Sequence, residues 1–250
     1  MMAGLLDVEQ DEGVWTIVLN RPEKRNALSS ELVDQLLDLV NLGATEHVRV
    51  LVFRGAGKNF SAGFDFSDVS EQSEGDLVLR FVRIQMLLQA VASSPCLTVA
   101  FAHGKNFGAG VDLIAACRER YAAADASFRM PGLKFGLVLG TRRFGDLVGR
   151  ERAAQIQQEA ATFDANRALE MGFVHQVVEP ASWDVHVDAA RTRASSLNDG
   201  VRMSLYRVLD SQQPDVDMAT LVRSAAQKGL KERVARYLRT AGGTVGNDRG

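Results

Sequence analysis

The stretch that most constrains the fold is an apolar strand that runs into a glycine-rich turn and then into a buried helix. Residues 96–102 predict the strand, three glycines follow within seven residues (Gly104, Gly108 and Gly110), and residues 111–117 predict the helix. A helix that begins in this way exposes main-chain N–H groups, which favour negative charge. Glycine has no Cβ, so a ligand can approach the backbone closely. The pattern is typical of an anion site and equally of a tightly packed turn.

A second strand ends in a similar way. Residues 48–55 predict a buried strand, and a glycine-containing turn follows over residues 56–67. Asp65 or Ser67 is placed to cap the element that comes next. Two such turns can aim two main-chain N–H groups at one point, which is the geometry of an oxyanion hole. The spacing alone leaves open whether the two turns converge.

Strands and helices alternate over the first two thirds of the chain. A strand over residues 13–20, a helix capped by Ser29 or Ser30 and the strand at 48–54 together predict a parallel pair joined by a crossover. A polar stretch over residues 68–76 is expected to be a mobile loop. Further strands are expected over 120–124, 127–130 and 173–178, and further helices over 77–92, 141–148, 150–161 and 165–171.

The last third of the chain predicts helices only. They are expected over residues 182–196, 200–210 and 216–240, with a polar, frayed end over 241–250. We therefore expect an α/β core over residues 1–180 and a helical region over residues 181–250. The apolar faces of this helical region need cover, from the core or from a neighbouring subunit.

Composition excludes several classes of protein. The chain has 250 residues and a net charge of −2, so no broad basic surface favours nucleic acid. Cys96 and Cys117 lie in apolar segments without metal-type spacing, which predicts buried reduced thiols and no metal site. No apolar run reaches the roughly 20 residues of a membrane span, and the N-terminus lacks the pattern of a signal peptide. We expect a cytoplasmic protein without a membrane or nucleic-acid partner.

Four segments, in the same order along the chain, resemble the crotonase (enoyl-CoA hydratase/isomerase) superfamily. They are residues 19–29, 60–66, 104–113 and 164–174. The resemblance covers nearly the whole chain and implies an α/β fold, a spiral of ββα units followed by a C-terminal helical region. It implies assembly as a homotrimer or a dimer of trimers. It also implies an acyl-CoA thioester as substrate, with coenzyme A as part of that substrate and no separate cofactor.

The resemblance also implies roles for particular residues. In this family two main-chain N–H groups hold the thioester oxygen as it becomes an enolate, and by position these donors are Phe64 and Ala109. The motif around the second donor is usually three glycines, here Gly108-Ala109-Gly110. The substrate contacts carried over by position are Lys24, Ala27, Leu28, Ala62, Asp65, Phe66 and Gly108, and Lys24 and Arg25 are placed to meet phosphates.

The chain departs from the family at the two catalytic carboxylates. Hydratases of this family have two glutamates beside the substrate, and these positions hold Asp112 and Gly132 here. Two carboxylates serve hydration, because one activates water and the other supplies a proton. A single carboxylate can shuttle one proton, which favours double-bond isomerisation with Asp112 as the acid/base and Gly132 beside the substrate.

Several alternatives stay open at this point. The chain is expected to be a hydratase or an isomerase. One alternative is an acyl-CoA hydrolase or synthase, with an anion or water beside Gly132. The other is a non-catalytic acyl-CoA binding protein. His103 and the carboxylates of the 68–76 loop are further candidates for the base. Arg142 and Arg143 are expected to form salt bridges between subunits or to lie in solvent, with a substrate carboxylate as the alternative partner.

Overall fold

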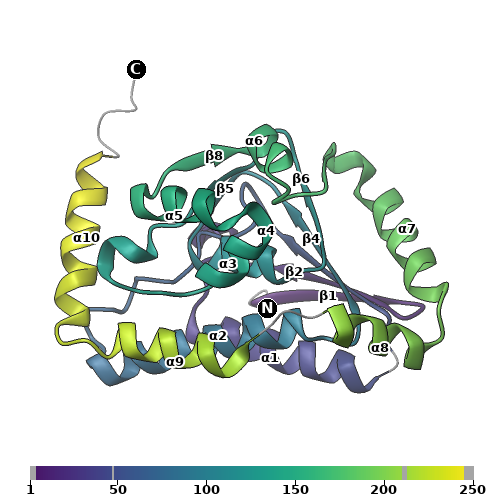
Figure 1. Cartoon of the computed structure of the whole chain (residues 1–250), viewed down its shortest axis with the longest axis horizontal. Helices are drawn as coiled ribbons and strands as arrows, with labels where there is room; N and C mark the ends of the chain where they lie inside the picture. Colours follow the sequence, from purple (N-terminus) through teal and green to yellow (C-terminus); the bar gives the residue numbers. More distant parts are fainter. Residues whose placement is uncertain (1–3, 47, 210–212, 245–250) are drawn as a thin grey trace.

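A six-stranded sheet forms the centre of the fold, and helices cover both of its faces (Figure 1). The computed structural model describes residues 4–46, 48–209 and 213–244. The strands lie in the order β1-β2-β3-β4-β6-β9; β1 and β2 pair antiparallel, and all other neighbours pair parallel. Their bounds are β1 (Leu6–Asp11), β2 (Val14–Leu19), β3 (Val50–Gly55), β4 (Leu97–Ala102), β6 (Glu119–Ala122) and β9 (Gln176–Val177).

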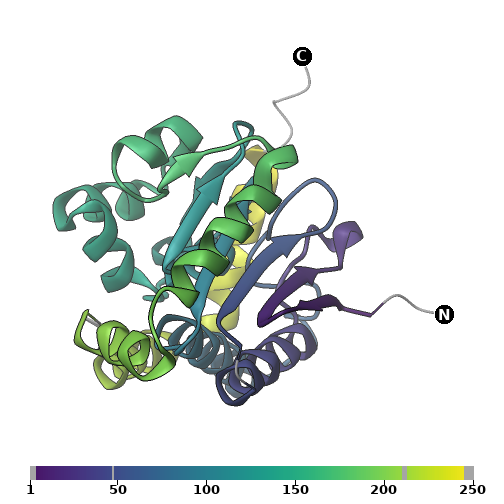
Figure 2. The same ribbon diagram turned by 90° about the vertical axis from the view of Figure 1, so that its right-hand side faces the viewer.

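Both faces of the central strands are apolar, as expected for parallel strands that are covered on two sides. In β3, Leu51 and Phe53 belong to the larger core, which also takes in the buried faces of α1 (Ser30–Thr45) and α2 (Glu74–Ala92). The alternate residues Val50 and Val52 pack in a second core with α7 (Trp183–Ser195). Figure 2 shows α7 crossing this second face of the sheet. The predicted α/β class is therefore confirmed.

A second, three-stranded sheet carries the glycine-rich turn. It has the order β5-β7-β8, with β5 and β7 parallel and β7 and β8 antiparallel. Strand β5 was not predicted, because three residues inside a turn show no alternation of apolar and polar side chains. The helix α3 (Ala109–Ala116) follows directly and is buried throughout. The strands are β5 (Lys105–Phe107), β7 (Ser127–Arg129) and β8 (Thr162–Asp164).

The serine cap predicted for the first helix is confirmed, and an aspartate caps α6 (Ala165–Glu170) in the same way. The Ser29 hydroxyl accepts a hydrogen bond from the Leu32 N–H at the start of α1. The Asp164 carboxylate accepts one from the Arg167 N–H at the start of α6. The remaining helices are α4 (Thr141–Val148), α5 (Arg150–Glu159), α6 (Ala165–Glu170), α8 (Asp199–Leu209), α9 (Pro214–Ala225) and α10 (Leu230–Thr244).

Four expectations are wrong in detail. Residues 216–240 do not form one helix, because the chain leaves α9 and turns at Gly229, whose φ is +80°. The 68–76 stretch is not all loop, since a capping box of Ser73 and Asp76 starts α2 at residue 74. Asp65 caps no helix, and its carboxylate instead accepts hydrogen bonds from the Ser67 N–H and hydroxyl. The predicted frayed end is helical up to residue 244, and residues 245–250 are outside the described part of the chain.

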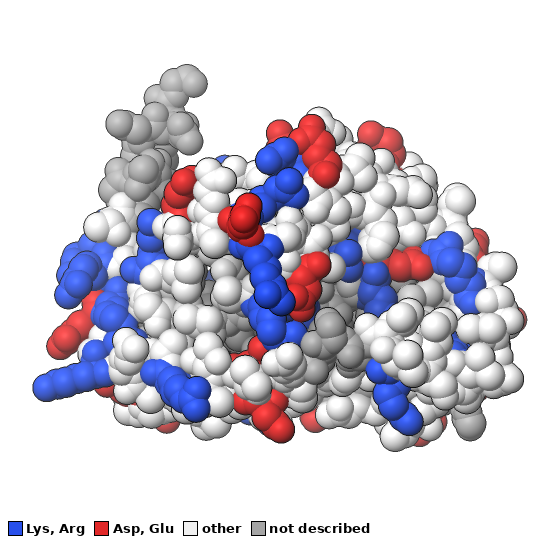
Figure 3. Space-filling view, viewed as in Figure 1, with Lys and Arg blue, Asp and Glu red and all other residues white. Residues whose placement is uncertain are grey.

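The helices after residue 180 pack against different parts of the molecule. α7 lies on the sheet, α9 packs on α2, and α10 packs on α2 and on the 3-10 turn Gly132–Phe135. The division of the chain at residue 180 stays a prediction. Within the described residues no helix has the length and apolar character needed to cross a bilayer. Basic and acidic side chains are interspersed over the face shown in Figure 3.

Candidate active site

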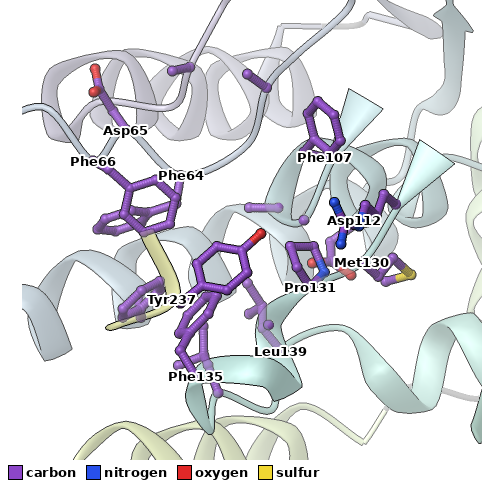
Figure 4. Close-up of a pocket in the computed structure, with 18 of the residues that line it drawn as sticks. Phe64, Asp65, Phe66, Phe107, Asp112, Met130, Pro131, Phe135, Leu139 and Tyr237 are labelled. Carbon is purple, nitrogen blue, oxygen red and sulfur yellow. The ribbon is translucent and has the colours of Figure 1, made fainter. Parts of the chain in front are cut away.

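The two glycine-containing turns predicted from the sequence meet at one cavity of about 620 Å³. Its exposed rim is formed by residues 23–25, and its walls come from residues 62–67, β5, α3, residues 129–139 and α10. Figure 4 shows an aromatic wall with Phe64 and Tyr237 facing a second wall with Asp112 and Met130. The cavity thus joins segments from both ends of the chain.

Close backbone contact joins the two turns. A Cβ on Gly63 would lie 2.2 Å from the Phe107 carbonyl oxygen and 3.1 Å from the Ala109 nitrogen, and the φ of Gly63 is +78°. Only glycine fits a backbone that is both left-handed and this close to a neighbour. The residues on either side of the contact, Phe64 and Ala109, both line the cavity.

The main-chain N–H groups of Phe64 and Ala109 are available to a ligand. Within the described part of the chain, neither donates to a protein acceptor. The neighbouring amides are used: Asp65 N–H donates to the Leu28 carbonyl, and Gly108 N–H donates to the Arg129 carbonyl. The Ala109 amide also stands in the first turn of α3, where the helix dipole favours negative charge.

The Phe64 end of the cavity is held by aromatic contacts and by one buried cation. The Phe64 ring stacks on Phe81 with centroids 4.4 Å apart and meets Phe66 edge-on at 5.0 Å. The Arg80 guanidinium lies 4.2 Å from the Phe64 ring centroid and donates to the Asp65 carbonyl oxygen at 2.7 Å. These contacts fix the segment that carries the Phe64 amide.

Asp112 is the most perturbed carboxyl group on the cavity wall. Its side chain is 2% exposed, and its Oδ1 atom has no partner among the described residues. Burial raises the pKa of Asp112 from 3.8 to about 8, and the positive charge of Arg143 opposes this rise. In the described part of the chain, two other carboxylates line the cavity: Glu23 is exposed at the rim, and Asp65 pairs with Arg21 at 2.9 Å. Asp112 is thus the buried group best placed to exchange a proton.

Gly140 makes room for the Asp112 carboxylate. Its φ is +63°, and a Cβ there would lie 1.9 Å from Asp112 Oδ1. Any side chain at residue 140 would therefore displace the carboxylate. Gly140 directly precedes α4, the helix that carries Arg143 and supplies the opposing charge.

Most residues predicted to touch the substrate do line the cavity. Leu28 does not: it is buried in the core, and its N–H donates to the Gly63 carbonyl at 2.7 Å, beside Phe64. The cavity residues shared with the sequence analysis are Lys24, Ala27, Ala62, Phe64, Asp65, Phe66, Gly108, Ala109, Asp112 and Gly132.

The other candidates for the base lie elsewhere. His103 is outside the cavity lining, and its Nε2 lies 3.0 Å from the Gly57 carbonyl oxygen. No carboxylate of the 68–76 loop lines the cavity. Arg142 forms a two-pronged ion pair with Asp217 of α9, so its structural role lies within the chain and not in the inter-subunit pair or the solvent position expected for it. Arg143 is buried beside Asp112.

Some of the lining was missed by the sequence analysis. Tyr237 and Leu238 reach the cavity from α10, more than 120 residues beyond both glycine-containing turns in the sequence. Gln157 of α5 also lines it and is 3% exposed. A single buried glutamine on a polar helix gives no sequence signal. Tyr237 belongs to a helical pattern of apolar residues, and that pattern predicted a packed helix without a role in a site.

Comparisons with known proteins agree with this geometry. A family model described as enoyl-CoA hydratase/isomerase matches residues 9–238. A crystal structure from Bordetella parapertussis, provisionally described as an enoyl-CoA hydratase/isomerase, is 56% identical, covers 94% of this chain and 99% of its own, and has a TM-score of 0.93. A Mycobacterium leprae protein named "Probable enoyl-CoA hydratase echA6" is 34% identical over 69% of this chain and 71% of its own. A human mitochondrial Delta(3,5)-Delta(2,4)-dienoyl-CoA isomerase is 31% identical over 74% of this chain and 61% of its own.

Proposed function

Because this chain belongs to the enoyl-CoA hydratase/isomerase family and has the crotonase fold, we propose that it is an acyl-CoA enzyme that forms a thioester enolate. One observation carries the proposal. The buried carboxyl of Asp112 lines the same cavity as two main-chain N–H groups that have no acceptor among the residues that the structure describes. Enolate formation needs a group that accepts the proton and a site that stabilises the anion. The carboxyl group supplies the first and the two N–H groups supply the second.

The Phe64 and Ala109 amides would act as the oxyanion hole. As the α-proton leaves, negative charge develops on the thioester oxygen, and fixed N–H donors stabilise that charge more than the neutral carbonyl. Removing one such donor typically costs about 3 kcal/mol of transition-state stabilisation. Since both donors are main-chain groups, neither the bulk of Phe64 nor the methyl group of Ala109 changes their chemistry.

The exposed rim would receive coenzyme A. Lys24 and Arg25 are exposed at the mouth of the cavity and suit its phosphates. The aromatic and aliphatic side chains farther in suit the acyl group. The buried side chains would also exclude water from the reacting carbons.

The reaction favoured by this site is double-bond isomerisation of an enoyl-CoA. Asp112 removes a proton from one carbon, the enolate forms, and the same carboxyl returns a proton to another carbon. Hydration needs a second group to activate water, and the position of the second family glutamate is Gly132. Among the described lining residues, the remaining carboxylates are the exposed Glu23 and the ion-paired Asp65.

The test is to supply the purified protein with 3-enoyl-CoA and 2-enoyl-CoA of the same chain length. Isomerisation produces the conjugated thioester at unchanged mass, which ultraviolet absorbance and mass spectrometry detect together. Hydration adds the mass of one water. Isomerisation that is lost in Asp112→Asn supports the proposal. Hydration as the main reaction, or full activity in the variant, would contradict it.

We also propose that the protein assembles as a homotrimer or a dimer of trimers in the cytoplasm. In support, α8 presents apolar side chains to solvent, among them Val208 at 81% and Leu209 at 72% exposure. Apolar surface of this kind favours an interface between subunits.

A further inference from the structure

Tyr237 is a polar residue of the cavity that the proposed mechanism does not use. It lies on α10, lines the cavity and is half-buried. Figure 4 shows its hydroxyl oxygen extending from the aromatic wall into the space in front of Asp112 and Pro131. No other tyrosine of the described residues lines the cavity. Whatever fills the cavity therefore meets this phenol on an otherwise apolar aromatic wall.

The Tyr237 hydroxyl has no partner within the described part of the chain. The one side-chain donor that reaches Tyr237 there, the Thr240 hydroxyl, ends on its main-chain carbonyl at 2.8 Å. The phenolic oxygen is also not one of the buried atoms that lack a hydrogen bond, so it is open to the cavity. A tyrosine hydroxyl normally finds a hydrogen-bond partner, and here a bound molecule can supply it.

The segment of α10 that carries Tyr237 is held firmly. Arg233, one helical turn earlier, donates through Nε to the Phe135 carbonyl at 3.0 Å. Its Nη1 donates to the Gln227 and Lys228 carbonyls at 2.7 and 2.9 Å. The Tyr237 ring packs on the Phe135 ring with centroids 5.2 Å apart. The hydroxyl is thus placed before a ligand arrives, which is what makes a donor effective on a developing charge.

The phenol of Tyr237 suits the role of donor better than that of base. Burial raises the pKa of Tyr237, and the positive charge of Arg129 opposes this rise. A raised pKa keeps the proton on the oxygen at neutral pH, so the group offers an O–H to an acceptor. Asp112 already serves as the proton acceptor in the proposed function, whereas negative charge on the substrate gains from every further donor.

We propose that Tyr237 is a further catalytic residue, whose hydroxyl donates a hydrogen bond to the enolate formed in the cavity. It adds a side-chain donor to the main-chain donors of Phe64 and Ala109, and no bond of the phenol is made or broken. A hydrogen bond to a charged oxygen is stronger than one to a neutral carbonyl, so this donor favours the enolate over the bound thioester. The inference rests on the proposed function and deepens it.

The experiment measures enolate formation with acetoacetyl-CoA, a 3-ketoacyl thioester whose enolate has its own ultraviolet absorption band. The ratio of enolate to ketone in the bound thioester is read from this band at saturating protein. Wild type should raise the ratio above its value in buffer at the same pH. Tyr237→Phe, which removes only the hydroxyl, should reduce the ratio of the bound thioester about 10-fold.

Tyr206→Phe is the matched control. Tyr206 lies on α8, is half-buried like Tyr237, also has a pKa raised by burial, and is not part of the cavity lining. This variant should keep the wild-type ratio. The midpoint of thermal unfolding should be the same in Tyr237→Phe and wild type, because the lost hydroxyl makes no hydrogen bond to the described residues; a marked fall would indicate a structural tyrosine and overturn the inference.

The outcomes separate this inference from the function on which it rests. If Tyr237→Phe bound acetoacetyl-CoA with the wild-type ratio of enolate to ketone, the inference would be overturned and the proposed function would stand. If Tyr237→Phe no longer bound the thioester, the hydroxyl would hold the neutral ligand, which also overturns the inference. Wild type that binds acetoacetyl-CoA without raising the ratio would refute the proposed enolate chemistry, and the inference with it.

Discussion

At the scale of the residue, the proposed chemistry depends on a carboxyl group whose pKa is raised by burial. The pKa of Asp112 is raised to about 8 by burial, and the unfolded chain would restore its ordinary value of 3.8. A group matched to neutral pH in this way can both accept and return a proton. The same burial must cost stability, because the ionised form is poorly solvated inside the protein.

The first prediction is a pH dependence of stability caused by Asp112. Between pH 4 and pH 8 the folded state keeps a proton that the unfolded state has released, so the free energy of unfolding should fall by about 1.4 kcal/mol per pH unit. The fall should end above pH 8, where both states are ionised. Urea unfolding of wild type and Asp112→Asn at about pH 5 and about pH 8 measures it.

Asp112→Asn should lose this slope, so its advantage over wild type should grow as the pH rises. All other titrating groups are common to both proteins and cancel in the difference. If the free energies of unfolding of wild type and Asp112→Asn changed in parallel over this pH range, Asp112 would not be the buried acid described above.

The second prediction concerns the room that Gly140 leaves for the carboxylate. Gly140→Ala places a methyl group on Asp112 Oδ1 and should abolish turnover. Gly149→Ala is the matched control, because its φ is also positive at +90° but nothing lies within 4 Å of its added Cβ. Both variants carry backbone strain, about 1 kcal/mol at Gly140 and up to about 3 kcal/mol at Gly149, whose ψ of 140° lies outside the left-handed helical region. Only the first variant should lose activity. Equal kcat values in the two variants would argue against this role of Gly140.

At the scale of the element, helix α2 positions the first turn of the site. Arg80 reaches from α2 over the Phe64 ring and holds the Asp65 carbonyl, while its Nη1 donates to Gln72 at 3.0 Å. Burial lowers the pKa of Arg80, and Asp65 and Asp68 oppose that effect, so it stays a cation. Helix α2 thus orients a main-chain donor of the site as well as packing in the core.

The third prediction separates this role from general packing. Arg80→Met should lower kcat about 10-fold with little change in KM, because the Phe64 amide loses its alignment, and should cost about 2 kcal/mol of stability. Arg83→Met on the same helix removes only the partly exposed pair with Asp34 and should cost less than about 1 kcal/mol. If Arg80→Met raised KM alone, Arg80 would act in substrate binding and not in positioning.

The elements also show what the sequence could predict. Successive side chains of the central strands point alternately into two apolar cores. The apolar run from Val50 to Phe53 was therefore sufficient to predict a buried strand. The break at Gly229 was not, because Leu221, Leu230 and Val234 are apolar on both sides of it. Residues of the turns at 62–64 and 107–109 were recognised, whereas Gln157 and Tyr237 enter the site only through tertiary packing.

At the scale of the whole molecule, the fourth prediction concerns assembly. The exposed apolar side chains of α8 should be covered by a neighbouring subunit, as in the proposed trimer. Val208→Glu with Leu209→Glu should shift the mass measured by sedimentation toward the monomer, because buried charges oppose association. Val185→Glu on α7, at 68% exposure, is a comparison at another surface. An unchanged mass in the α8 variant would exclude α8 as the interface.

The central claim, that this cavity forms a thioester enolate through Asp112, is tested most directly by α-proton exchange. Wild type and Asp112→Asn are incubated in D₂O with saturated and unsaturated acyl-CoA thioesters, and deuterium at the α-carbon is followed by mass spectrometry. Wild type should exchange the α-proton, and Asp112→Asn should bind the same thioesters while exchange stops. Tight binding of the thioesters by wild type without any exchange would contradict the account and indicate a protein that binds acyl-CoA without reacting with it.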